Sequence, residues 1–322
     1  MTEEAVRRAA AHERITLGWV DFGLLVGAII WGINFAVVKQ TLTEITPLAF
    51  AAVRFSLAGV LLFVILRAMG QNLHIKRGEI WKVLLLGIAG IAGTQAFFTL
   101  GIARTSAGSS SVIMATTPVF VTLFGVLLRV ERITPAIALG VAFSVGGTAL
   151  LVGFGSGEIS FGAQVFVGNV LVLLGTVCWA VYTTLVNPLL GHYSPMKIIT
   201  LVTITGSVVL LVLAAGELPA MRWAQVSWQG WLGLGYSFAL SSALVYAIWT
   251  AAIQRVGNAR TAVFMNVTPI AAVIASWLLL GEVLKTWQVV GAIITLAGVT
   301  LTRVAPQENP KGAVEEPHAY RS

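Results

Sequence analysis

Ten apolar runs, each long enough to cross a lipid bilayer as a helix, dominate this sequence. A spanning helix needs about 20 mainly apolar residues. Because the connections between the runs are short, we expect neighbouring helices to be antiparallel, with no soluble domain inserted. The predicted fold is therefore an all-α integral membrane protein with ten transmembrane helices. The runs cover residues 19–40, 46–68, 80–103, 108–129, 133–153, 165–187, 195–215, 228–252, 258–280 and 286–304.

The composition supports a membrane protein and argues against other classes. Hydrophobic residues make up 57% of the chain and charged residues only 10%, whereas soluble domains carry about a quarter charged residues. The net charge of +7 is interpreted as orientation charge at a membrane surface, so no nucleic-acid partner is expected. Cys178 is the one cysteine, which excludes an intramolecular disulfide. The four histidines lie in the tails or between apolar runs, so we expect neither a metal site in the membrane nor a cofactor.

The distribution of Lys and Arg predicts how the chain is oriented. If the ten runs are helices, fifteen of the 20 basic residues fall on the side of the N-terminus, four fall on the opposite side, and Arg54 lies inside a helix. Basic loops remain cytoplasmic, so both termini are predicted to be cytoplasmic. Residues 1–18 form a polar N-terminal segment, and the first apolar run is too long for a signal peptide. Residues 305–322 are rich in proline and charge and are predicted to be a disordered tail.

The sequence also contains an internal repeat. The segment MATTPVFVTLFGVLLRVERIT, from Met114, returns as MNVTPIAAVIASWLLLGEVLKT, from Met265. An offset of 151 aligns Pro118 with Pro269, and further upstream an offset of 148 aligns Trp31 with Trp179. The chain therefore divides into two five-helix units, 19–153 and 154–304. Because five is odd, the second unit must have the opposite orientation, which predicts an inverted repeat with a binding site near the midplane. The alternative is a duplicated membrane scaffold that transports nothing.

These motifs resemble a known family. The stretches WGINFAVVK in the first predicted helix and TPLAFAAVRFSLAG in the second, together with the TP…E ending of the fourth and ninth, resemble the drug/metabolite transporter superfamily of the EamA type. The resemblance covers about residues 19–304. It implies a bacterial inner-membrane carrier of small metabolites, and it is greatest to the exporters of aromatic and neutral amino acids.

The first predicted helix supplies the first candidate substrate contacts. Trp31, Asn34 and Phe35 share one helical face, with Lys39 at its edge. Aromatic rings and one amide on a single face suit an amphipathic ligand. Packing of Trp31, and a hydrogen bond from Asn34 to a neighbouring helix, would explain the same pattern without a substrate.

Polar and aromatic residues recur at matched positions in both halves, as a pocket between two repeats requires. Any one of them is more easily explained by packing, so the prediction depends on the set. The further candidates are Gln95, Phe98, Met114, Trp179, Tyr182, Tyr246, Trp249 and Asn266.

Two basic residues fall within the apolar runs. A cation in a bilayer costs about 2.5–3.5 kcal/mol even on insertion scales, so it usually faces a cavity or a partner. A substrate carboxylate or phosphate would be a natural partner. Lys39 could instead extend to the outer surface, and its role stays open. For Arg54 we favour a structural role, because the family resemblance often includes an arginine at this position.

Pro118 and Pro269 remove backbone hydrogen bonds at mirrored sites, which favours hinges for alternating access over static kinks. Glu131 and Glu282 are predicted to serve at helix ends or in interfacial ion pairs. Since no Asp, Glu or His lies in the middle of a predicted helix, a proton relay is disfavoured, and facilitated diffusion or exchange is the simpler mechanism.

The sequence therefore predicts a secondary transporter, not an enzyme, which exports amino acids by alternating access. Helices 1, 3, 4, 6, 8 and 9 should line its cavity. Helices 5 and 10 should be peripheral, with small residues that pack within the monomer or in a homodimer. The alternatives are an exporter of nucleobases, organic anions or drugs, an integral-membrane lipid enzyme, and a channel.

Overall fold

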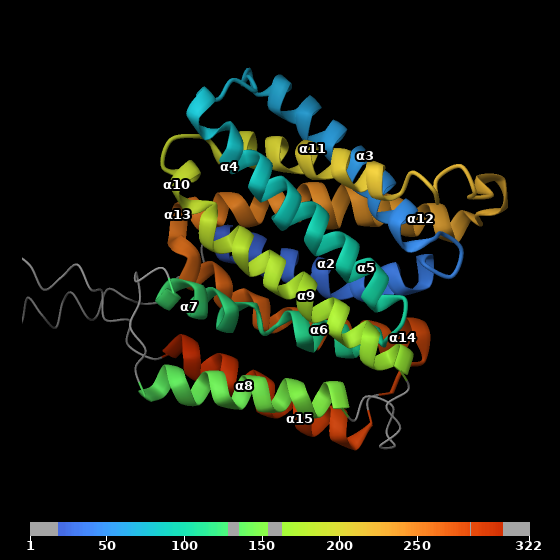
Figure 1. Ribbon diagram of the computed structural model, residues 1–322, viewed down its shortest axis with the longest axis vertical. Helices are drawn as coiled ribbons and strands as arrows, with labels where there is room; N and C mark the ends of the chain where they lie inside the picture. The colour runs from blue at the N-terminus through green and yellow to red at the C-terminus, as the bar shows by residue number, and fades with distance from the viewer. Residues whose placement is uncertain (1–18, 128–134, 154–162, 284, 305–322) are drawn as a thin grey trace, which may run out of the picture.

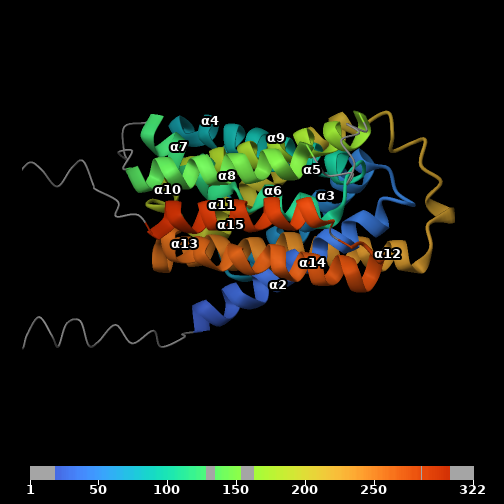
Figure 2. The ribbon, with the colours of Figure 1, turned by 90° about the horizontal axis from the view of Figure 1, so that it is seen from below.

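The computed structural model describes residues 19–127, 135–153, 163–283 and 285–304, and every element in these ranges is helical. The predicted N-terminal segment 1–18, the tail 305–322 and Glu131 lie outside them. The helices run side by side, so that most of them extend from one end of the molecule to the other (Figures 1 and 2). The beginning of the first helix and the end of the last lie at the same end of this bundle.

The predicted first half begins with two long helices and ends with a third. Between them lie shorter α-, 3₁₀- and π-helical elements. Its elements are α2 (Trp19–Thr41), α3 (Pro47–Ala68), η1 (Arg77–Glu79), α4 (Ile80–Leu85), η2 (Leu86–Gly93), α5 (Thr94–Ile102), α6 (Ala107–Met114), α7 (Thr117–Leu127) and α8 (Pro135–Gly153).

The predicted second half has a similar order of elements. It comprises α9 (Ala163–Leu185), α10 (Asn187–Leu190), α11 (Pro195–Leu213), η3 (Trp223–Gln225), α12 (Trp228–Tyr236), η4 (Ser237–Leu244), α13 (Val245–Val263), η5 (Phe264–Asn266), α14 (Val267–Leu280) and α15 (Thr286–Val304).

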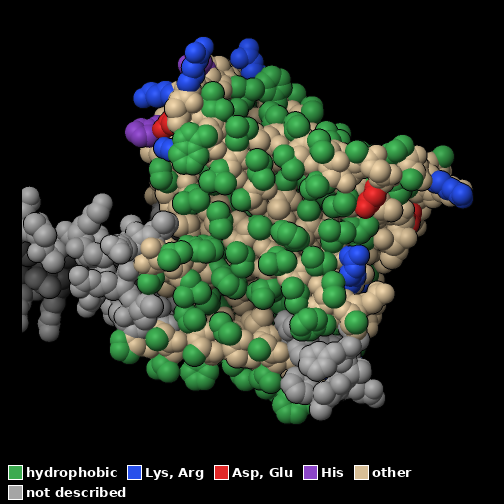
Figure 3. Space-filling view, viewed as in Figure 1, with side chains coloured by type: hydrophobic (Ala, Val, Ile, Leu, Met, Phe, Trp, Pro, Cys, Tyr) green, Lys and Arg blue, Asp and Glu red, His purple; other side chains and the backbone are tan. Residues whose placement is uncertain are grey.

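The described residues include seven helical segments that are long and apolar enough to cross a membrane, together with three shorter apolar helices. The chain is thus an all-helical membrane fold, while the count of ten spans remains a prediction. Large apolar side chains such as Phe22, Val60 and Val212 are 60–71% exposed in α2, α3 and α11, as lipid contact requires. Hydrophobic side chains cover the middle of the face in Figure 3, and charged ones gather at its upper left and right edges.

One predicted boundary is wrong. The ninth apolar run was expected to begin at residue 258, but α13 continues without a break to Val263. In the first half the corresponding break is stabilised by Ser106, whose side chain accepts a hydrogen bond from the Ser109 N–H and so caps α6. The residue 151 positions later is Gly257, which has no side chain to cap a new helix.

The two halves contain matching irregularities. η2 and η4 are both π-helical segments of eight residues, and they begin 151 positions apart. A Cβ added to Gly147 of α8 would overlap the backbone of Thr295, and one added to Gly298 of α15 would overlap the backbone of Ser144. These glycines, themselves 151 apart, let α8 and α15 pack closely at one side of the bundle (Figure 1). The inverted orientation of the two halves stays a prediction.

Each of the two mirrored prolines follows an interruption of its helix. α6 ends at Met114 and α7 begins at Thr117, so Pro118 is the second residue of α7. Pro269 is the third residue of α14, directly after the 3₁₀ turn η5. In the first turn of a helix the missing N–H costs nothing. Both prolines therefore stand in the first turn of a helix and not inside a continuous one.

Candidate functional site

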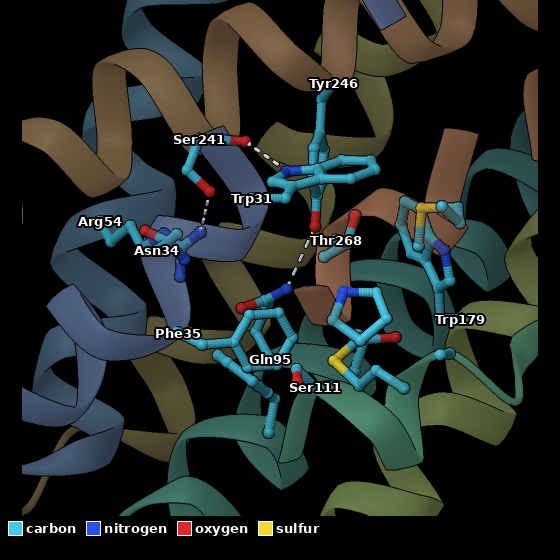
Figure 4. A pocket seen from close by; sticks show the side chains of 16 residues that line it. Trp31, Asn34, Phe35, Arg54, Gln95, Ser111, Trp179, Ser241, Tyr246 and Thr268 are labelled. Carbon is cyan, nitrogen blue, oxygen red and sulfur yellow. Dashed lines mark hydrogen bonds between the residues drawn. The ribbon is translucent and has the colours of Figure 1, made fainter. Parts of the chain in front are cut away.

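A cavity lies between the two halves of the bundle, and its empty volume of about 580 Å³ includes open solvent at its mouth. Ten of the predicted site or hinge residues contribute to its wall (Figure 4). They are Trp31, Asn34, Phe35, Arg54, Gln95, Phe98, Met114, Trp179, Tyr246 and Pro269.

Trp31 is the centre of an aromatic cluster on one side of the cavity. Its ring centroid lies 5.6 Å from that of Tyr246 and 6.2 Å from that of Trp179, both in edge-to-face arrangements. A second pair, Phe35 and Phe98, is also edge-to-face at 5.4 Å. Such aromatic pairs stabilise one another by about 0.5–1.5 kcal/mol beyond burial. The cluster therefore forms a firm apolar wall that could pack against the apolar part of a ligand.

Hydrogen bonds fix the polar side chains of the wall. Gln95 Nε2 donates to the Tyr246 hydroxyl at 3.1 Å, and Asn34 Oδ1 accepts from the Ser237 hydroxyl at 2.9 Å. Trp31 Nε1 donates to the carbonyl oxygen of Ser241 at 2.9 Å. Ser237 and Ser241 belong to η4, and π-helical turns are frequent at functional sites because their wider backbone presents groups differently from an α-helix. The irregular helix of the second half thus orients side chains of the first.

Arg54, from α3, adds a positive charge to the wall and is only 2% exposed. Its Nε donates to the Ser242 hydroxyl at 2.7 Å and to the Ser237 carbonyl at 3.3 Å, while Nη2 donates to the Ser241 hydroxyl at 3.1 Å. The guanidinium also lies 5.0 Å from the ring centroid of Phe55, close enough for a cation–π interaction. Arg54 therefore joins α3 to η4 and also borders the cavity.

Three predicted contacts do not reach the cavity wall. Lys39 donates from Nζ to the carbonyl oxygens of Ile102, Ala103 and Thr105, at 2.7–3.3 Å, so it caps the end of α5. Tyr182 and Trp249 pack behind the wall as buried partners of Trp179 and Trp31. Helical spacing alone could not separate the layer of side chains that lines a cavity from the layer that supports it.

Pro118 and Asn266 are the remaining predicted residues. Pro118 does not line the cavity, whereas its repeat partner Pro269 does. Asn266 ends η5, and its side chain lies outside the described residues.

Six residues of the wall were not predicted. Met265 could have been found, because it is the repeat partner of Met114. Ser241 could not, since nothing in the sequence indicates a π-helical turn there. The remaining four are small or hydroxyl-bearing residues without a distinctive spacing: Thr94, Ser111, Ala115 and Thr268.

Three carboxylates bind backbone N–H groups near helix starts at the same end of the bundle. Glu282 accepts from Ala107 and Gly108 at the start of α6, as expected of a helix-end residue, and Glu217 accepts from Leu48 and Ala49 at the start of α3. Negative charge is favourable at a helix N-terminus.

The third carboxylate, Glu44, connects the two halves outside the membrane-spanning segments. It accepts hydrogen bonds from the backbone N–H and the hydroxyl of Ser227, which precedes α12, at 2.6 and 2.7 Å. The bond from the N–H is the main reason that the pKa of Glu44 lies below its ordinary value. These contacts hold the loop after α2 against the start of α12.

The described residues contain no group of three His, Cys, Asp or Glu side chains that could hold a metal ion. The cavity wall has no acidic side chain among its described residues either. Its chemistry is therefore that of aromatic rings, hydroxyls, two amides and one guanidinium.

Apolar helices that face lipid and surround a central aromatic cavity define the chain as a multi-pass membrane transporter. More specifically, the chain belongs to the EamA-like transporter family, which matches residues 18–153 and again residues 166–304. Similar proteins include the "Uncharacterized transporter YyaM" of Bacillus subtilis, 28% identical over 89% of this chain and 93% of that protein. The "Probable terminal-alkyne amino-acid exporter" of Streptantibioticus cattleyicolor is 26% identical over 87% of this chain and 92% of that protein.

A solved structure supports the same fold. The structure titled "Crystal structure of protein" is similar with a TM-score of 0.62 and 16% identity, over 86% of this chain and 94% of the other. The family and the names of these relatives confirm the prediction of a transporter of small metabolites rather than an enzyme.

Proposed function

We propose that the protein exports neutral and aromatic amino acids across the bacterial inner membrane, through the cavity around Trp31. The observation that carries this proposal is the combination of aromatic rings and a buried guanidinium on one wall. An amino acid with an apolar side chain offers a carboxylate for the guanidinium and an apolar surface for the rings. One relative is named a probable amino-acid exporter, which supports this substrate class.

The transport cycle would be alternating access between two inverted halves, 19–153 and 154–304, with both termini in the cytoplasm. Support comes from the contacts between repeat partners, since Gln95 bonds to Tyr246 and Trp31 packs on Trp179. The interruptions before Pro118 and Pro269 are the natural hinges, because fewer helical hydrogen bonds must yield there. In this cycle the close-packed pair α8 and α15 is peripheral, and a homodimer through it is the remaining alternative.

Exchange or facilitated diffusion is the proposed mode. A membrane proton relay needs an ionisable group that can carry the proton, and no carboxylate or histidine lines the cavity in the described part of the chain.

Counterflow in liposomes tests this function. Purified protein would be reconstituted into liposomes loaded with unlabelled phenylalanine or alanine, and uptake of the labelled amino acid would be followed with and without a pH gradient. We expect saturable uptake that does not require the gradient. Absence of uptake for every neutral amino acid would reject amino-acid export, and uptake only with the gradient would reject exchange. Protein-free liposomes are the control.

A further inference from the structure

Arg54 has an unused hydrogen-bond donor inside the bundle. Its Nε and Nη2 are bonded to η4, but Nη1 is fully buried and has no hydrogen-bond partner. Among the described residues no carboxylate lies within 4.0 Å of the guanidinium, so its positive charge has no counter-ion there. A charged group inside a membrane protein normally faces a cavity or an opposite charge, and Arg54 borders the cavity (Figure 4).

Other unpartnered polar atoms border the same cavity. Gln95 donates through Nε2 to Tyr246, but its Oε1 is buried without a hydrogen-bond partner. The hydroxyl of Thr268 is also buried and unpartnered. Both side chains are about 95% buried, and both belong to the wall. A buried polar atom without a partner is costly, and a ligand with polar groups at one end would supply the partners.

The distribution of these atoms indicates the chemistry of the ligand. Arg54 Nη1 can only donate, and a guanidinium binds carboxylates better than neutral oxygens. Gln95 Oε1 can only accept, which suits an N–H or ammonium group. The remaining wall is largely aromatic and apolar, and no described acidic side chain is present to attract a molecule that is only cationic.

We propose that Arg54 binds the carboxylate of the transported molecule, which makes the substrate class that of monocarboxylates with an apolar or aromatic body. Neutral amino acids belong to this class, with their ammonium group placed near Gln95 Oε1. This inference rests on the proposed transport function but narrows it to one charged group and one residue. Lys39 is not the carboxylate-binding residue, because its ammonium already donates to three carbonyl groups at the end of α5. A purely structural Arg54, which only joins α3 to η4, is the competing explanation.

Matched pairs of probes separate these explanations on the unmodified protein. Binding to purified protein would be measured by calorimetry for 3-phenylpropionate against 3-phenylpropionamide and for phenylalanine against phenylalaninamide. The pairs leucine and leucinamide, and 4-methylpentanoate and its amide, extend the test to aliphatic bodies. We expect each acid to bind about 10-fold or more tightly than its amide, since a hydrogen bond to a charged group contributes that much. Equal binding of acid and amide in every pair, or no binding of any acid, would overturn the proposal.

Variants assign the preference to Arg54. In Arg54→Gln the acid-to-amide ratio should fall to about 2-fold or less, because the amide keeps a donor but loses the charge. Lys39→Met is the matched control, since it removes a cation of a candidate membrane-spanning helix from outside the cavity. It should keep the wild-type ratio. A preference that survives in Arg54→Gln, or disappears in Lys39→Met alone, would contradict the assignment.

The same probes distinguish failure of this inference from failure of the proposed function. If neutral amino acids show no counterflow but 3-phenylpropionate still binds better than its amide, amino-acid export is rejected and the role of Arg54 is supported. If amino acids exchange but phenylalaninamide competes as well as phenylalanine, the transport function is supported and the role of Arg54 is rejected.

Discussion

Gln95 and Tyr246 lie 151 positions apart, the offset of the internal repeat, and they are hydrogen-bonded to each other inside the cavity wall. Gln95 Nε2 donates to the Tyr246 hydroxyl at 3.1 Å, and both side chains are 95% buried. Residues at equivalent positions of two repeats can touch only near the axis that relates them. The bond joins the two halves. In the predicted inverted repeat it would lie close to the axis, where a site shared by both halves is expected.

Tyr246→Phe should destabilise the protein by about 1–3 kcal/mol, because it leaves the Gln95 amide N–H buried without its acceptor. The free energy of unfolding, from titration with sodium dodecyl sulfate, would measure this loss. We also expect weaker substrate exchange in liposomes, since Gln95 would no longer be held in place.

The double variant Gln95→Met with Tyr246→Phe provides the control. It replaces both polar partners by apolar groups of similar size, so it should be less destabilised than the sum of the two single variants. Strictly additive losses would mean that the two side chains act independently and that the bond contributes nothing.

Lys39→Met should lower the stability by about 1–2 kcal/mol, because a cation at a helix C-terminus stabilises the exposed carbonyl groups of α5. Lys39→Arg should lose less, since it keeps the charge. Thermal unfolding in detergent would compare the two variants with the wild type. If Lys39→Met instead unfolds at the wild-type temperature and binds no substrate, Lys39 would be a substrate contact and not a helix cap.

Much of the site could be predicted from spacing alone. The helical face of Trp31, Asn34 and Phe35 does border the cavity, because the i, i+3, i+4 pattern fixes which side chains point the same way. The repeat offset then led to Trp179 and Tyr246, since equivalent residues of two halves meet near the axis.

The other features of the site depend on side-chain packing, which residue spacing in the sequence does not determine. Lys39 lies at the edge of the same face, yet its long side chain reaches carbonyl groups of α5 instead of the cavity. Ser241 enters the wall because η4 is π-helical, which rotates the side chains that follow relative to an α-helix. The sequence did not predict that α13 continues through residue 258, because hydrophobicity alone does not indicate whether the backbone stays helical at a turn.

Glu44 predicts a pH dependence of stability. Hydrogen bonds from Ser227 lower its pKa in the folded protein, so Glu44 stabilises the fold fully above the ordinary pKa of a glutamate. This contribution is lost as the pH falls through the lowered pKa. The unfolding temperature of the wild type should therefore exceed that of Glu44→Gln at neutral pH, and the difference should shrink in acid. A difference that is constant down to the acid range would show that the charge of Glu44 is not involved.

Two adjacent glycines of α8 provide a matched test of its packing. A Cβ at Gly147 would overlap the backbone of Thr295 in α15, whereas a Cβ at Gly146 would meet nothing within 4 Å. Gly147→Ala should therefore destabilise the protein by about 1–3 kcal/mol through overpacking. Gly146→Ala should be neutral or stabilise it by about 0.5–1 kcal/mol, because alanine favours the helix.

Unfolding in sodium dodecyl sulfate would measure the free energy of unfolding of both variants. A lower stability of Gly147→Ala than of Gly146→Ala would support the close packing of α8 on α15. If both alanines stabilise the protein equally, α8 and α15 do not pack through these glycines. The second measurement is the substrate affinity of the folded fraction of Gly147→Ala, determined from exchange in liposomes. It should retain the wild-type affinity, because neither helix contributes a described residue to the cavity wall. A changed affinity would instead mean that the α8 and α15 pair moves with the cavity during transport and is not peripheral to it.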